Sequence, residues 1–260
     1  MIAEIKGKIS STGSNLSERL EDKLTGDFFG SLRYIPFNKV AKRILLKTKF
    51  LYEGCAVILK EIDNIDASYW GHNIEFWPSD PQGELDVLMD FGNIVIGIEV
   101  KLYSGLSSDD DIVNLAGTGA IDSRHQLSRE SRILKKKILG ADKKALLIFI
   151  APEHICYPVC REACDRNIIE RGVVLGYIPW EEILVTLEES IDKQELNDFE
   201  RLIIQDIVDL LKRKGLERFR SFDIECPNMD GDLWFCFDYY DIDFSFIYHI
   251  AVEDCYYEFK

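Results

Sequence analysis

Apolar residues recur along this chain with two different periods, which predict where helices and strands lie. Spacings of three and four residues predict amphipathic helices, and short apolar runs bounded by Gly, Pro or Asn predict strands. The expected helices span residues 14–35, 38–62 (interrupted near Gly54), 124–139, 157–172 and 197–215, with another beginning near residue 178. The expected strands span residues 72–80, 84–91, 93–102, 143–152 and 173–180.

The order of these elements predicts a sheet with both strand directions. Short connections join the first three strands, which should therefore pair antiparallel, whereas helices join the later strands, which should run parallel. The expected fold class is α/β, with a mixed β-sheet flanked by helices in residues 1–180. Residues 181–260 are expected to add C-terminal helices and an aromatic, acidic β appendage that packs on this core.

The predicted hairpin over residues 84–102 carries charged side chains inside otherwise apolar strands. Because alternate residues of a strand share a face, the charges gather on one face of each strand and aliphatic residues occupy the other. Gly92-Asn93 suits a two-residue turn. The register that follows places Asp86 opposite Glu99, and Glu84 opposite Lys101.

Two carboxylates that face each other across a strand pair repel unless something positive lies between them. Lys101 offsets part of the repulsion between Asp86 and Glu99, and a hard divalent cation such as Mg²⁺ would offset more. Gly97 lies on the same face and leaves room for a ligand to approach. A salt-bridge cluster on a half-exposed sheet remains an alternative, although isolated charges in apolar strands usually have a partner or a function.

These residues resemble the signature of the PD-(D/E)XK nuclease superfamily, whose fold is called restriction-endonuclease-like. The signature is an acid on one core strand and, on the next strand, an acid, any residue and Lys. Asp86 and Glu99-Val100-Lys101 match it, with Leu85 where many members have Pro.

Two further parts of the chain are similar to that family. Members often carry a Glu on the first core helix, for which Glu21 is the expected match and Glu18 and Asp22 are alternatives. Many also carry a Gln-Leu pair on the helix after the catalytic strand, which Gln126-Leu127 matches. The resemblance covers residues 14–180 and does not extend to residues 181–260.

The resemblance implies a metal-dependent nuclease that hydrolyses phosphodiester bonds in bacterial defence or DNA processing, with DNA as the first candidate substrate and RNA as the second. Asp86, Glu99, the Val100 carbonyl and Glu21 would bind Mg²⁺ or Mn²⁺. Lys101 would orient or deprotonate the attacking water and stabilise the developing negative charge. Gln126 would position the water or a backbone phosphate.

The charge of the chain changes this picture only in part. The net charge of −15 counts against a protein that wraps a nucleic-acid duplex. The charge is uneven, because residues 221–260 hold ten acidic residues and one basic residue. Basic residues cluster at 38–50, 131–144 and 211–220, and Arg124, Arg129 and Arg132 are candidates for contacts with phosphates.

The acidic, aromatic C-terminal region also supports an alternative function. In that alternative, the chain is a catalytically inactive nuclease-fold module that binds a protein partner or forms a homo-oligomer. No run of 18 apolar residues and no signal-peptide pattern is found, so we expect a cytoplasmic protein without a membrane partner. The seven cysteines indicate no disulfide framework, and Cys156, Cys160 and Cys164 should line one helix face rather than bind zinc or an iron–sulfur cluster.

Overall fold

The computed structural model describes residues 16–218, apart from residues 104, 107, 111–122 and 194 and the side chains of residues 16–20. The helices are α2 (Leu16–Leu32), α3 (Ala41–Leu46), the 3₁₀ helix η1 (Glu53–Ile58), α4 (Leu59–Asp63), α5 (Gln126–Ile138), α6 (Glu153–Asp165), α7 (Trp180–Asp192) and α8 (Asp198–Arg213). The main strands are β1 (Ile74–Phe76), β4 (Val87–Asp90), β5 (Ile94–Val100), β6 (Lys144–Ala151) and β7 (Val173–Pro179). Two short strands, β2 (Ser79–Asp80) and β3 (Gly83–Glu84), form a separate pair.

The five main strands form one sheet in the order β1-β4-β5-β6-β7. The first three pair antiparallel, and β5, β6 and β7 run parallel to one another. The predicted mixed sheet is therefore confirmed, and so is its division into an antiparallel part and a parallel part. Among the described helices, none combines the length and the apolar character needed to cross a membrane.

The hairpin between β4 and β5 has the register predicted from its turn. Val87 faces Ile98, and Asp90 faces Val95. Gly92 has a φ of 86°, in the left-handed region that a two-residue hairpin turn requires and that glycine adopts without strain. The register continues one step beyond the last paired residues, toward Asp86 and Glu99.

The prediction for Glu84 is wrong. Glu84 pairs with Ser79 in the small β2–β3 hairpin, rather than facing Lys101. The cause lies at Trp77, where the backbone adopts a φ of 49° directly after β1. The amide of Trp77 still bonds to the Asp86 carbonyl at 3.0 Å, and the chain then leaves the main sheet through Pro78, which cannot donate to a ladder.

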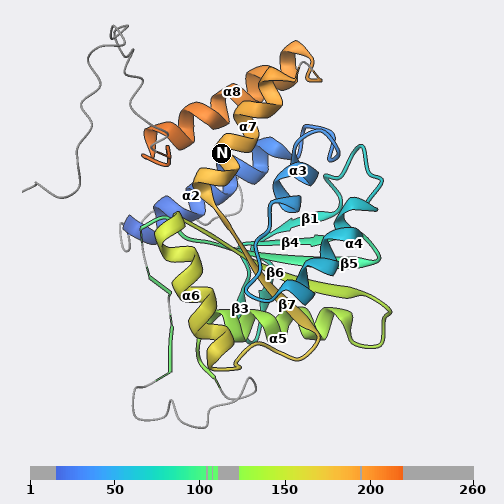
Figure 1. The fold of residues 1–260 in the computed structure, drawn as a ribbon, viewed down its shortest axis with the longest axis vertical. Helices are drawn as coiled ribbons and strands as arrows, with labels where there is room; N and C mark the ends of the chain where they lie inside the picture. Colours follow the sequence, from blue (N-terminus) through green and yellow to red (C-terminus); the bar gives the residue numbers. More distant parts are fainter. Residues whose placement is uncertain (1–15, 104, 107, 111–122, 194, 219–260) are drawn as a thin grey trace, which may run out of the picture. The chain divides into compact units, whose positions relative to one another are not determined.

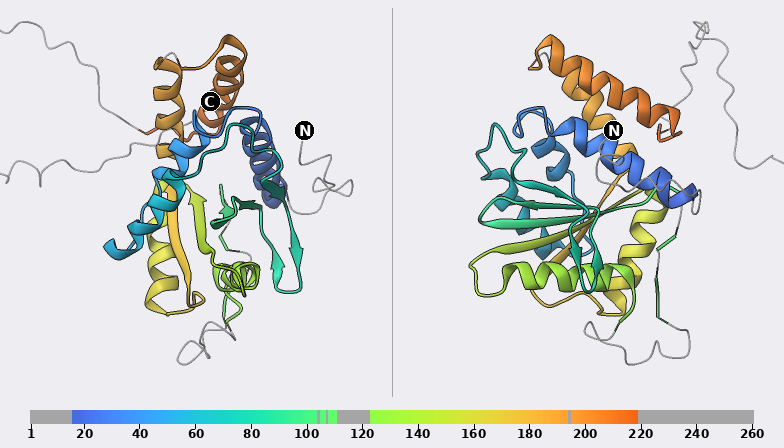
Figure 2. Two further views of the ribbon diagram at one scale, coloured as in Figure 1. Left: turned by 90° about the vertical axis from the view of Figure 1, so that its right-hand side faces the viewer. Right: turned by 180° about the vertical axis from the view of Figure 1, so that it is seen from behind.

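Helices cover both faces of the sheet. In Figure 1, α2, α7 and α8 lie above the strands and α5 lies below them, and the reverse view in Figure 2 shows the same arrangement. Side chains from the first group of helices share one apolar core with Ile96 and Ile98, whereas α5 and α6 share a second core with Val95 and Phe149. Every residue of β5 is buried. The half-exposed sheet of the alternative interpretation is therefore wrong, because α5 covers the charged face, but the salt bridges that it expected are present around Lys101.

Two helices differ from their predicted limits. The helix expected over residues 38–62 is divided into α3, η1 and α4. The amide and the carbonyl of Lys49 both bond to Tyr177 on the outer edge of β7, so the chain is extended at that point. The helix expected from residue 157 begins at Glu153, and Cys156 and Cys160 pack inside the second core, as the helix-face interpretation predicted.

The compact unit that contains the sheet continues to Arg218. Helices α7 and α8 belong to its first core, to which they contribute Ile183, Leu187, Ile204 and Val208. Helix α8 begins with a capping box, in which Asn197 and Glu200 each bond the backbone amide of the other. The β appendage expected in the last 40 residues lies outside the described part of the chain.

Candidate functional site

The candidate site lies where β4 begins and β5 ends. Asp86 directly precedes β4, and Glu99 and Lys101 lie at the end of β5. The Val100 amide donates a hydrogen bond of 2.8 Å to Asp86 Oδ2, so the hairpin itself holds this carboxylate across the two strands. The Lys101 carbonyl accepts a bond of 3.0 Å from Trp180 Nε1, which fixes the chain after β5 against α7.

A buried ammonium group lies among the acids. Lys101 Nζ is 2.8 Å from Glu99 Oε1 and 3.7 Å from Glu21 Oε2, and the Lys101 residue is only 7% exposed. Burial alone would lower the pKa of Lys101. The neighbouring carboxylates of Glu99, Asp86 and Glu21 outweigh burial and raise that pKa instead, so the group is an ammonium ion at neutral pH.

Glu21 joins α2 to the end of β5. Its Oε1 accepts hydrogen bonds from the amides of Leu102 at 2.8 Å and Tyr103 at 3.2 Å. Glu21, the expected match among the helix acids, therefore contacts both Lys101 and the backbone of the site. Asp22 is partly exposed, and its charge contributes to raising the pKa of Asp86. The side chain of Glu18 lies outside the described residues.

Asp86 is held in an environment that disfavours its charge. Part of its side chain reaches solvent, but protein atoms surround the carboxyl group, and this burial raises its pKa well above the ordinary value. The charge of Glu99 raises the pKa further. The Val100 amide and Lys101 oppose the shift without cancelling it. A cation between Asp86 and Glu99 would relieve the same repulsion.

Gln126 completes the group of residues that the sequence predicted. It is the first residue of α5, it is buried, and its Nε2 donates a hydrogen bond to Glu99 Oε1. The structure thus brings together Asp86, Glu99, Lys101, Glu21 and Gln126, which come from a hairpin and two helices.

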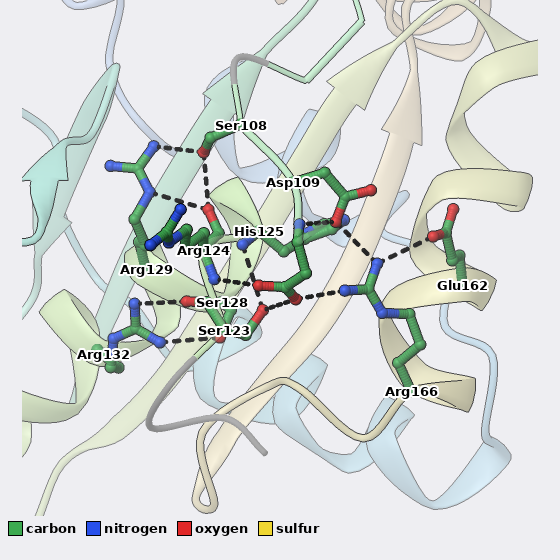
Figure 3. Close-up of polar contacts among 11 residues, drawn as sticks. Ser108, Asp109, Ser123, Arg124, His125, Ser128, Arg129, Arg132, Glu162 and Arg166 are labelled. Atoms are coloured by element: carbon green, nitrogen blue, oxygen red, sulfur yellow. Dashed lines mark hydrogen bonds and ion pairs between the residues drawn. The ribbon is translucent and has the colours of Figure 1, made fainter. Parts of the chain in front are cut away.

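A cluster of polar side chains fixes the start of α5, where Gln126 lies. We call it the loop-base cluster, and it consists of Ser108, Asp109, Asp110, Ser123, Arg124 and Arg166. In Figure 3, Arg166 reaches from α6 to Asp109, and it also binds Asp110. Asp110 in turn accepts bonds of 2.6 Å from the Ser123 hydroxyl and from the Arg124 amide. The Gln126 amide is held by the Ser108 carbonyl at 3.1 Å.

Two arginines proposed as phosphate contacts have a different role. Arg129 donates to the Gln82 carbonyl at 2.7 Å and to the Ser108 hydroxyl at 3.0 Å. Arg132 donates to Gln82 Oε1 at 2.8 Å and to the Ser123 carbonyl at 2.9 Å. These guanidinium groups tie α5 to the β2–β3 turn and to the loop-base cluster, so the expectation that they meet phosphates is not supported. Arg124 remains exposed.

The space beside Gly97 is filled by the protein itself. A Cβ atom at Gly97 would lie 3.0 Å from both methyl carbons of Leu134 in α5. The expectation that this glycine leaves room for a ligand is therefore wrong. Gly97 allows α5 to pack closely on β5, and this close approach brings Gln126 to Glu99.

Glu130 is a site residue that the sequence interpretation missed. It lies one turn after Gln126 in α5 and is only 2% exposed. No described donor bonds to its carboxyl oxygens, but the Glu99 carboxyl lies within hydrogen-bond reach, so the two acids can share a proton. Burial raises the pKa of Glu130 well above the ordinary value, and the charge of Glu99 raises it further. The four-residue spacing from Gln126 is the one signal in the sequence that places Glu130 on the same helix face.

The carboxylates form a plausible ligand set for a divalent cation, but not a ready-made cage. Within the part of the chain that the structure describes, no three His, Cys, Asp or Glu side chains are grouped as a metal site. Mg²⁺ is commonly held by one or two carboxylates, with water and substrate completing its coordination. Asp86 and Glu99 fit that pattern, and the buried carboxyl group of Glu130 beside them strengthens the fit.

No protein-family model matches the chain, and neither a curated protein nor a solved structure is significantly similar to it. The chemistry of the site is therefore inferred from the residues and their geometry.

Proposed function

We propose that the protein is a metal-dependent nuclease with a restriction-endonuclease-like fold, related to the PD-(D/E)XK superfamily. It would hydrolyse phosphodiester bonds, with DNA as the first candidate substrate and RNA as the second. One observation carries the proposal: Glu99 accepts hydrogen bonds from both Lys101 and Gln126 while Asp86 lies at the same end of the hairpin. These are four of the five side chains that the family resemblance selects, and Glu21 is the fifth.

The charge of the site makes the proposed activity dependent on a cation. Glu21, Asp86 and Glu99 surround a single buried ammonium group, so the unneutralised site would repel a phosphodiester. Bound Mg²⁺ or Mn²⁺ would neutralise the phosphate and make a bound water a stronger nucleophile. Asp86, Glu99 and the Val100 carbonyl would hold the ion. Glu21, whose Oε1 binds two backbone amides, would mainly anchor the end of β5.

The raised pKa of Lys101 in the metal-free site favours one of its two possible roles. A lysine that acts as a general base needs a lowered pKa, and the acids around Lys101 have the opposite effect. Lys101 would therefore orient the attacking water and stabilise negative charge on the phosphate as an ammonium ion. Gln126 would keep Glu99 in place and would also orient water or a phosphate oxygen.

The test is a cleavage assay on plasmid DNA, single-stranded DNA and RNA with Mg²⁺ or Mn²⁺. Wild-type protein is compared with Asp86→Asn and with Lys101→Met, which keeps the aliphatic volume of the buried side chain, after circular dichroism has shown that both variants fold. Cleavage by the wild type alone, abolished by a chelator, is the expected result.

Equal cleavage by the wild type and both variants would show that a contaminant or another site is responsible. Metal binding without cleavage would indicate that a partner is needed to activate the enzyme. Neither metal binding nor cleavage would favour the alternative, a catalytically inactive nuclease-fold module that acts through protein–protein binding.

A further inference from the structure

Glu130 has the most unusual environment among the described acids of the site. The exposed fraction of this residue is 2%, no described donor bonds to its buried carboxyl oxygens, and they lie within hydrogen-bond reach of the Glu99 carboxyl. Buried carboxyl groups are normally hydrogen-bonded or paired with a cation, because an uncompensated polar group in an apolar interior is destabilising. The environment of Glu130 therefore needs a further explanation.

The charged groups around Glu130 are those of the candidate site. The charges that act on Glu130 include those of Glu99, Asp86 and Lys101, all at the end of the β4–β5 hairpin. The preceding turn of α5 carries Gln126, whose side chain touches Glu99. Neighbouring turns of one helix face thus present an amide and a carboxyl group to the same pair of acids.

An apolar side chain at position 130 would pack more simply than a carboxyl group. The next turn of the same helix carries Ile133 and Leu134, which are fully buried in the second core. A Leu or Met at position 130 would bury without the cost of desolvating a carboxyl group. A carboxyl group that is retained there against the Glu99 carboxyl, with no described donor of its own, is consistent with a ligand for a cation.

We propose that Glu130 is a third carboxylate ligand of the divalent cation, acting together with Asp86 and Glu99. This inference rests on the proposed metal-dependent function and adds a residue that the family signature does not contain. With Glu130, the ion would be bound from both strands of the hairpin and from α5. The cation would in turn offset the repulsion between Glu130 and Glu99.

The experiment measures Mn²⁺ binding by isothermal titration calorimetry on the full chain at one fixed pH. The proteins are the wild type, Glu130→Gln, Asp86→Asn and the control Glu200→Gln. Glu200 is also buried, but it lies on α8, where it pairs with Lys39 at 2.6 Å. Glu130→Gln should weaken Mn²⁺ binding by at least about tenfold, since even removing a residue that only supports a ligand costs that much.

The melting temperatures without metal separate binding from folding. Glu130→Gln should not lower the melting temperature, because it removes a buried acid that faces Glu99 and leaves an amide that can donate to the same carboxylate. Glu200→Gln should lower the melting temperature and leave Mn²⁺ affinity unchanged. Glu130→Leu is a second variant with the same expected loss of affinity, and it covers the case in which Gln itself perturbs folding.

Unchanged Mn²⁺ affinity in a folded Glu130→Gln or Glu130→Leu protein, with binding lost in Asp86→Asn, would overturn the role of Glu130 and leave the proposed function standing. Absence of Mn²⁺ binding by the wild type would overturn both. A loss of affinity in Glu200→Gln equal to that in Glu130→Gln would attribute the effect to general destabilisation and would also overturn the inference.

Discussion

The side-chain amide of Gln126, at the start of α5, donates a hydrogen bond to Glu99, the penultimate residue of β5. The same carboxylate oxygen accepts a bond of 2.8 Å from Lys101 Nζ. A helix and a strand thus share one buried acceptor, and the orientation of Glu99 depends on donors from both elements. Four predictions test the bond between Gln126 and Glu99 and the contacts around it.

Replacing Gln126 by Leu should destabilise the protein, because Glu99 then loses one of its two described donors in a buried setting. We expect the free energy of unfolding to fall by about 1.5–3 kcal/mol, the range for hydrogen bonds to charged groups. Urea unfolding of the metal-free protein measures it. Gln205→Leu is the matched control, since that exposed glutamine bonds only to Asp209 among the residues described, and its effect should stay within about 0.5 kcal/mol. Equal effects of the two substitutions would contradict the role of Gln126.

Asp86→Asn should raise the melting temperature at pH 8 and have little effect near pH 4. The pKa of Asp86 is raised in the folded protein by burial and by Glu99, so the unfolded chain releases its proton first, near pH 4. Stability must therefore fall as the pH rises from about 4 toward the raised pKa, and Asn removes that loss. Thermal melts in chelator-containing buffers across this range test the prediction.

Asp90→Asn is the control of opposite sign for that experiment. Burial alone would raise the pKa of Asp90, but Lys143 and the Gly92 amide lower it below its usual value. Its contribution to stability is therefore present above pH 4 and is lost as the pH falls through the lowered pKa. Asp90→Asn should lower the melting temperature at pH 8. An Asp86→Asn difference that does not change with pH would refute the assignment of a raised pKa to Asp86.

Gly97→Ala should separate α5 from β5. Its new methyl group would lie 3.0 Å from the methyl carbons of Leu134, and overpacking of this kind costs about 1–3 kcal/mol. Gly54→Ala is the control, because a Cβ at that position meets no atom within 4 Å. Chemical denaturation compares the two. If Gly97→Ala proved as stable as Gly54→Ala, the close packing of α5 on β5 would not be what requires a glycine.

Arg166→Ala should loosen the start of α5. Arg166 holds Asp109 and Asp110 of the loop-base cluster and also pairs with Glu162, so its removal leaves three carboxylates without this cation. Hydrogen exchange of the amides of residues 124–128 should accelerate, and the free energy of unfolding should fall by about 1–3 kcal/mol. Arg161→Ala is the control on the same helix. Arg161 makes an exposed pair with Asp165 at 3.4 Å, which contributes at most about 0.5 kcal/mol. Unchanged exchange at residues 124–128 would show that the loop-base cluster does not position Gln126.

The hairpin shows what a local pattern can predict. Its register depends on the Gly92-Asn93 turn and on the alternation of side chains, both of which are encoded within 20 residues. The charged faces of β4 and β5 follow directly from that register. The meeting of Asp86, Glu99 and Lys101 was therefore predictable before the rest of the fold was known.

Features that depend on distant residues were not predictable in this way. The pairing of Lys49 with Tyr177, which divides the helix expected over residues 38–62, joins parts of the chain far apart in sequence. Gly97 was interpreted as open space, because the sequence does not show that Leu134 packs there. Glu130 was missed because a Glu in a polar helix segment resembles a solvent-exposed residue until α5 is seen to lie on the sheet.

The bond between Ser123 and Asp110 joins two points of the chain that are 13 positions apart, directly beside the start of α5. Closing a loop at a fixed base depends only weakly on its length, since doubling the number of residues changes the free energy by about 0.6 kcal/mol. The contact of Gln126 with Glu99 therefore depends on a local clasp, made by a hydroxyl and a carboxylate, rather than on how much chain separates the two anchors.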